Sequence, residues 1–171
     1  MISRRGLVLG ALAVPVMARA QGFAGTYAPE AIPIGDGIWM VPGVDEGLDF
    51  ANGGAIANSV IMASDTGAIV VDSGPSLGFG QALAALAERL TGKPPALVYI
   101  THFHPDHSFG SAAFAAAAIH SLPATRADLE RDGAGFSDAM YRLLHGWMTG
   151  TELVLPEAAV AEGTVTFGGR R

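Results

Sequence analysis

The sequence predicts a mixed α/β (α+β) domain, in which short buried strands alternate with amphipathic helices. Two apolar runs, 68–72 and 96–100, have the length and β-branched composition of buried strands. Between these runs, Phe79, Leu83 and Leu86 recur at helical spacing and give one apolar face. A helix of this kind packs on a sheet, and it is expected to end near Gly92.

The segment before these elements also reads as sheet. Residues 38–41 and 55–63 are predicted strands, joined by a Gly- and Asp-rich loop over 43–54. Ser64-Asp65-Thr66-Gly67 is typical of a hairpin turn, which leads into the strand that ends at Asp72.

The later part of the chain predicts further helices and an unfinished hairpin. Residues 108–118 are a Gly-, Ala- and Phe-rich helix candidate. Residues 164–167 alternate in the manner of a strand, and Gly168-Gly169 is a hairpin-turn dipeptide. A second apolar stripe, which predicts a core-facing helix that ends near Gly150, consists of Phe136, Met140, Leu143, Leu144 and Trp147.

The first twenty residues have the pattern of a targeting segment rather than of a folded element. Ser3-Arg4-Arg5 and the apolar run after it resemble a twin-arginine export signal, although Leu9 leaves the ordinary secretory route open. The alternative is an uncleaved membrane anchor. Cleavage before Gln21 would place the protein in the periplasm, with a lead-in at 21–30 and one domain at 31–171.

The composition limits the classes of partner. Removal of residues 1–20 takes away Arg4, Arg5 and Arg19, so 7 basic and 16 acidic residues remain, a net charge of −9. This charge argues against nucleic acid or an anionic membrane as a partner. The expected partner is a small-molecule substrate. The chain contains no cysteine, so it has no disulfide framework and no cysteine-based zinc site.

The segment Thr101-His102-Phe103-His104-Pro105-Asp106-His107 holds three of the five histidines of the chain. Imidazole and carboxylate groups are good ligands for zinc, and a bound ion is the simplest way to make four such groups favourable together. The segment follows the predicted strand 96–100, and α/β folds often build their sites at that end of a strand.

The spacing indicates how these donors are divided. Side chains alternate on an extended segment, so His102 and His104 project to the same side and can share one metal. The chain then turns at Pro105, and Asp106 and His107 can face a second metal. Two metals about 3.5–4 Å apart can activate a water molecule for attack on a carbonyl, phosphoryl or thioester centre.

At these residues the sequence resembles the metallo-β-lactamase fold superfamily, whose loop reads H-x-H-x-D-H. The resemblance implies an αβ/βα sandwich and two zinc ions, one held by His102 and His104 and the other by Asp106 and His107. It also implies that Asp106 orients the nucleophilic water and accepts its proton, which makes Asp106 the catalytic residue. The loop at 43–54 stands where relatives carry a flap over the site, and a plain surface connection is the alternative.

The resemblance extends to residues outside this loop. Asp72 would orient the metal loop as a group behind the ligands, and the alternative is a strand-end turn residue. His120 is expected to lie outside the metal shell, and His145 is expected on the surface. The segments 104–110 and 150–156 resemble the periplasmic zinc metallohydrolases of the quinoprotein relay system and their sulfur-oxidation-associated relatives.

The resemblance also implies that the chain is an N-terminal fragment. Relatives continue past the hairpin at 168–169 to a Gly-His, a Gly-Asp and a last histidine, which complete both metal sites. Without them each ion keeps two protein ligands where zinc prefers three plus water. The fragment is therefore expected to be inactive alone.

The sequence thus predicts an exported metal-dependent hydrolase. Two alternatives stay open. One is a mononuclear iron enzyme of the persulfide dioxygenase type, which uses a similar loop. The other is a non-catalytic accessory protein that binds a periplasmic quinoprotein dehydrogenase.

Overall fold

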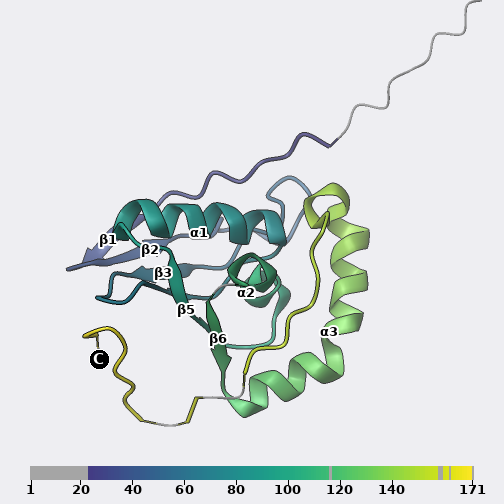
Figure 1. Cartoon of the computed structure of the whole chain (residues 1–171). Coiled ribbons are helices and arrows are strands. Elements are labelled where there is room, and N and C mark those ends of the chain that lie inside the picture. Colours follow the sequence, from purple (N-terminus) through teal and green to yellow (C-terminus); the bar gives the residue numbers. More distant parts are fainter. Residues whose placement is uncertain (1–22, 116, 158–159, 162, 171) are drawn as a thin grey trace, which may run out of the picture.

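The computed structural model describes residues 23–115, 117–157, 160–161 and 163–170. The predicted export signal lies outside the described residues. One six-stranded sheet, in the order β1-β2-β3-β4-β5-β6, forms the centre (Figure 1). Neighbours from β1 to β4 pair antiparallel, and β4, β5 and β6 are parallel. The strands are Ile32–Gly35, Ile38–Val41, Ser59–Met62, Ala68–Val71, Pro95–Ile100 and Ala118–Ser121.

Helix α1 (Leu77–Thr91) covers one face of this sheet (Figure 1). The side chain of Ser76 caps its first turn, and Gly92 ends it in the left-handed conformation with φ 73°. Leu83 is fully buried against sheet residues that include Val70 and Val98. The predicted helix and the two strands around it are therefore confirmed, as is the mixed α/β fold class.

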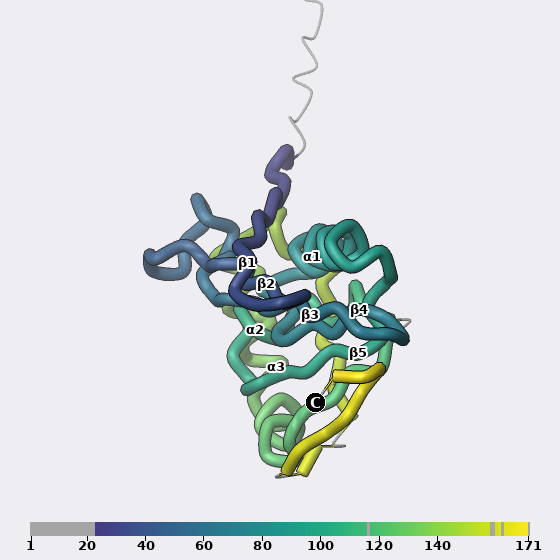
Figure 2. The backbone as a smooth tube through the Cα atoms, turned by 90° about the vertical axis from the view of Figure 1, so that its left-hand side faces the viewer, coloured from purple at the N-terminus to yellow at the C-terminus, as the bar shows by residue number. Residues whose placement is uncertain are grey.

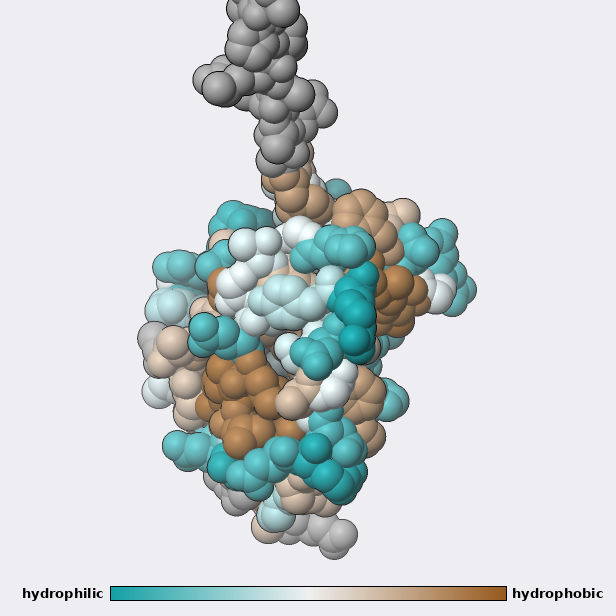
Figure 3. Space-filling model, turned by 90° about the vertical axis from the view of Figure 1, so that its right-hand side faces the viewer, coloured by the Kyte–Doolittle hydropathy of each residue, from teal (hydrophilic) through white to brown (hydrophobic). Residues whose placement is uncertain are grey.

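A second core lies under α3 (Pro123–Leu144) and the short helix η2 (His145–Met148). Figure 3 views the molecule from the right of Figure 1, where α3 is drawn, and shows hydrophobic surface in patches bordered by hydrophilic side chains. Four residues of the predicted apolar stripe lie in the second half of α3, but α3 ends at Leu144 rather than near Gly150, and Trp147 lies in η2. Leu144 and Met140 are buried, but Leu143 is 43% exposed, because the buried line follows i, i+4 spacing and Leu143 lies beside it.

The sheet begins earlier than predicted, and one of its strands is shorter. Strand β1 (Ile32–Gly35) was not predicted, although the Asp36-Gly37 turn after it is a hairpin signal. The predicted strand at 55–63 is confined to Ser59–Met62. Residues before it belong to the loop, where Gly53 and Gly54 have positive φ and Asn58 accepts a hydrogen bond from the Gly43 amide.

The continuous helix predicted for 108–118 does not form. The chain makes the single turn α2 (Pro105–Ser108), the short helix η1 (Ser111–Phe114) and then strand β6. Gly110 lies between the two helices and donates its amide hydrogen to the carbonyl of Gly74. That tertiary contact replaces a continuing helix.

The predicted turn at Gly168-Gly169 is present. Both glycines have positive φ, and Phe167 and Arg170 exchange two backbone hydrogen bonds across it. Residues 164–167 do not join the sheet, but Arg170 donates to the carbonyls of Ala63 and Asp36. In Figure 2 this yellow segment runs alongside the sheet near β5, and part of it lines a cavity of about 240 Å³ with sheet residues such as Tyr99.

None of the helices in the described ranges is long and apolar enough to cross a membrane.

The contact at Gly110 gives a first testable prediction. A Cβ atom there would overlap the carbonyl oxygen of Ser73, and backbone cannot yield as a flexible side chain can. We expect Gly110→Ala to lower the free energy of unfolding by about 2 kcal/mol or more. Gly135 is the matched control, because it lies in α3 with nothing within 4 Å of an added Cβ. Gly135→Ala should stabilise by about 0.5–1 kcal/mol, from helix propensity. Urea unfolding measures both, and equal effects would contradict the prediction.

Candidate metal centre

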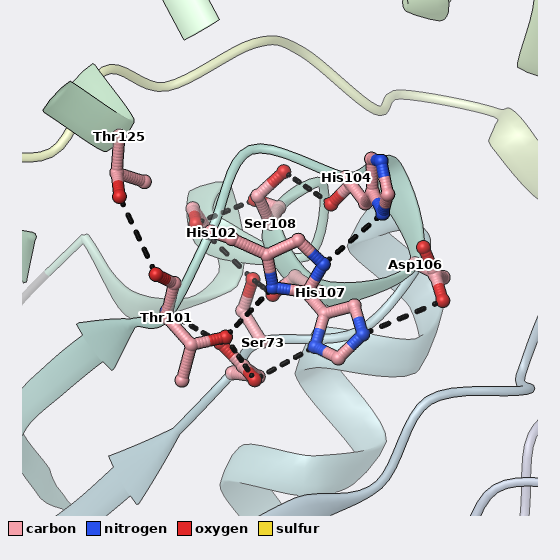
Figure 4. Close-up of polar contacts among 10 residues, drawn as sticks. Ser73, Thr101, His102, His104, Asp106, His107, Ser108 and Thr125 are labelled. Atoms are coloured by element: carbon pink, nitrogen blue, oxygen red, sulfur yellow. Dashed lines mark hydrogen bonds and ion pairs between the residues drawn. The ribbon is translucent and has the colours of Figure 1, made fainter. Parts of the chain in front are cut away.

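The four predicted donors lie together beyond the carboxyl end of β5. The Nε2 atom of His102 is 3.1 Å from the Nδ1 atom of His104, and the ring centres of His102 and His107 are 4.1 Å apart. On the other side of His107, its Nε2 atom is 3.6 Å from Oδ2 of Asp106. In Figure 4 one dashed line joins His102 to His104 and another joins His107 to Asp106. The donors therefore form two pairs, His102 with His104 and Asp106 with His107.

The local fold explains why these side chains converge. His104 precedes α2 in extended conformation, and Pro105 occupies the first position of α2, where proline is favourable. The single helical turn brings Asp106 and His107 back beside the histidines of the extended segment. The backbone is held by hydrogen bonds, since Ser108 donates to the His104 carbonyl and the Ser73 amide donates to the His107 carbonyl.

Asp72 lies behind the donors, just after β4. Strands β4 and β5 are parallel, so their carboxyl ends meet at the same edge of the sheet. The Asp72 side chain accepts hydrogen bonds from the Thr101 amide at 2.8 Å, the Thr101 hydroxyl at 2.8 and 3.0 Å, and Nδ1 of His107 at 2.7 Å. Asp72 is 4% exposed and has φ 63°, a conformation uncommon for a residue other than glycine. Asp72 follows the last residue of β4, as expected of a strand-end turn residue, and it also contacts the loop of the predicted metal ligands.

The electrostatic surroundings shift the pKa values of His107 and His102 in opposite directions. Burial lowers the pKa of His107, but the hydrogen bond and charge of Asp72, with the charge of Asp106, outweigh it, so the net shift is upward. For His102, burial and then the neighbouring His107 and His104 lower the pKa, and the two aspartates only partly oppose this. His102 therefore favours the neutral form, which is the form that binds a metal.

The donor spacing fits the chemistry of zinc. Two nitrogens bound to one tetrahedral zinc at about 2.0–2.1 Å lie about 3.3 Å from each other. The facing atoms of His102 and His104 are 3.1 Å apart, close to that value. Within the described residues no group of three or more His, Cys, Asp or Glu side chains is placed to hold an ion. Each pair could thus supply two donors.

The other two histidines stand apart from these pairs. His120 lies in β6, with its Nε2 atom 3.8 Å from Glu157, and His145 is exposed at the end of α3 beside Phe50. Thr101 is a residue of the site to which the sequence pattern assigned no role. Its place between the strand and the first histidine brings its hydroxyl to Asp72.

Comparison with known proteins agrees with this fold. The family model for the metallo-beta-lactamase superfamily matches residues 52–158, more than half of the chain. The chain therefore belongs to the metallo-beta-lactamase superfamily. A comparison with curated protein sequences found no match.

Solved structures show the same fold at low sequence identity. A metallo-beta-lactamase from Pontibacter korlensis matches with TM-score 0.61 and 14% identity, over 82% of this chain and 57% of that one. A metallo-beta-lactamase from Erythrobacter litoralis, solved with beta-mercaptoethanol in its active site, matches with TM-score 0.52 and 20% identity, over 64% of this chain and 48% of that one. A metallo-beta-lactamase from Pseudomonas aeruginosa in its mono-zinc form matches with TM-score 0.54 and 18% identity, over 63% of this chain and 48% of that one. The chain spans about half the length of these structures.

Proposed function

We propose that the protein is a metal-dependent hydrolase, with His102 and His104 binding one ion and Asp106 and His107 a second. The observation that carries this proposal is the pairing of donor atoms at distances of 3.1 and 3.6 Å at the carboxyl end of a parallel strand. Membership of the superfamily supports the same reaction class. We propose zinc as the resident metal, with iron as the alternative, and a small molecule as the substrate.

The residues of the site would have different roles in the proposed hydrolysis. Divalent ions in these sites would supply an activated water nucleophile and polarise the bond that it attacks. Asp106 would orient this water and accept its proton, since its carboxylate borders His107 and is 16% exposed. Asp72 and the backbone hydrogen bonds around α2 would hold the imidazoles in position.

The cellular setting is part of the proposal. Residues 1–20 would direct export to the periplasm, and the net charge of the mature chain argues against nucleic acid or an anionic membrane as a partner. The finer assignment to the quinoprotein relay and sulfur-oxidation group rests on the segments 104–110 and 150–156, and a quinoprotein partner would follow from it.

The test is hydrolysis with defined metals. The protein, in the longest form that its reading frame encodes, should be loaded in parallel with zinc, manganese or iron and assayed on ester, thioester, lactone and β-lactam substrates. We expect hydrolysis that a chelator removes and that Asp106→Asn reduces at least about 10²-fold. The 171-residue chain alone should bind ions weakly and show no turnover, because its described residues offer two donors to each ion.

Other outcomes would overturn the proposal in distinct ways. Oxygen consumption with a persulfide by the iron-loaded protein, prepared without air, would favour the dioxygenase reading. Stable binding to a quinoprotein dehydrogenase that survives His102→Ala and His104→Ala, without hydrolysis of any substrate, would favour an accessory protein.

A further inference from the structure

Thr101 shares three polar contacts through one hydroxyl oxygen. Its Oγ1 atom lies 2.8 and 3.0 Å from the two carboxylate oxygens of Asp72 and 3.0 Å from Nδ1 of His102. A threonine hydroxyl has a single hydrogen and two lone pairs. The oxygen therefore donates to one of these neighbours and must accept from the other.

The position of that hydrogen follows from what each neighbour carries. The Asp72 carboxylate, which is buried, has only lone pairs to offer. A hydroxyl hydrogen turned toward His102 would leave two oxygens of Thr101 and Asp72 facing each other at 2.8 Å without a hydrogen between them, which is repulsive. The hydrogen thus goes to Asp72, and the lone pair of Thr101 faces Nδ1 of His102.

We infer that Thr101 is a positioning residue that fixes the tautomer of His102, with the hydrogen on Nδ1 and the lone pair on Nε2. The Nε2 atom is the one that faces His104 across 3.1 Å, where the proposed first ion would bind. Figure 4 shows Thr101 between the strand and this ring. The tautomer is a property of the metal-free chain. Only its use, to present a lone pair to the first ion, rests on the proposed function.

The same carboxylate fixes the second ring in the same sense. Asp72 accepts the Nδ1 hydrogen of His107 directly, so in the neutral ring the lone pair is on Nε2, the atom 3.6 Å from Asp106. Asp72 thus collects three hydrogens, the amide and hydroxyl hydrogens of Thr101 and the ring hydrogen of His107. One buried carboxylate sets both imidazoles, one through Thr101 and one directly.

The inference is tested by the tautomer of His102 in the metal-free 171-residue chain. Long-range nitrogen-proton NMR correlations of the labelled histidines, at a pH where His102 is neutral, distinguish the two ring nitrogens. We expect the Nδ1-H form in the wild type, a mixture with the Nε2-H form in Thr101→Val, and return to the Nδ1-H form in Thr101→Ser. Zinc affinity should fall about 10–100-fold in Thr101→Val and recover in Thr101→Ser.

The outcomes separate this inference from the proposed function. A wild-type His102 in the Nε2-H form would overturn the inference, even if Thr101→Val failed to fold. An Nδ1-H form that Thr101→Val leaves unchanged would overturn it as well. The expected tautomers without zinc binding in any variant would leave Thr101 as the determinant of the ring and would count against the metal site.

Discussion

Asp72→Asn is expected to lower the free energy of unfolding of the metal-free chain by about 2–4 kcal/mol. The carboxylate is 4% exposed and accepts hydrogen bonds from both Thr101 and His107. An asparagine keeps one acceptor oxygen, but its amide group brings two hydrogens to a place where the neighbours also donate. Asparagine tolerates the positive φ of this position, so backbone strain adds little to the loss.

Asp106→Asn is the matched control for this substitution. Asp106 belongs to the same cluster, but its carboxylate lies 3.6 Å from His107 and is more exposed than that of Asp72. Its loss should change stability by less than about 1 kcal/mol. Urea unfolding of the three proteins with a chelator present measures the difference. Equal stability of the two variants would show that Asp72 does not hold the loop together.

The sequence was most informative where local pattern and tertiary contact agree. Helix α1 has a complete apolar face and a glycine after its last turn, so the sequence predicted its end near Gly92, where the structure has it. The position of the histidine loop after β5 followed from one apolar run bounded by prolines. Both features depend on neighbours in the sequence.

The errors arose where distant contacts decide the structure. Gly110 meets the backbone of residues 73–74, and this contact ends a helix that composition alone would continue. The role of Asp72 stayed open between turn and site, because strand-end aspartates serve both purposes. Only the parallel pairing of β4 with β5 brings its carboxylate to Thr101 and His107.

The largest expected effect on metal binding comes from the loss of one member of the first donor pair, His102 and His104. His102→Ala removes the Nε2 atom that faces Nδ1 of His104 at 3.1 Å, so one donor remains. We expect zinc to bind the 171-residue chain weakly but measurably, and the affinity of the first site to fall at least about 10²-fold in His102→Ala. The fold should persist, because the His102 ring donates no hydrogen bond to the core and its other partner is the exposed residue Thr101.

The chain itself offers the controls for this experiment. His120 is near Glu157 and His145 is at the exposed end of α3. Both are histidines that lie outside the two donor pairs, so their removal tests whether any imidazole of the chain binds the zinc. Calorimetric titration with zinc should give wild-type affinity for His120→Ala and His145→Ala, with circular dichroism as the check on folding. An affinity that survives His102→Ala and falls in His120→Ala would place the zinc at β6 instead. Absence of zinc binding by the wild-type chain would count against the paired donors, because two nitrogens already at metal-binding separation need no rearrangement to accept an ion.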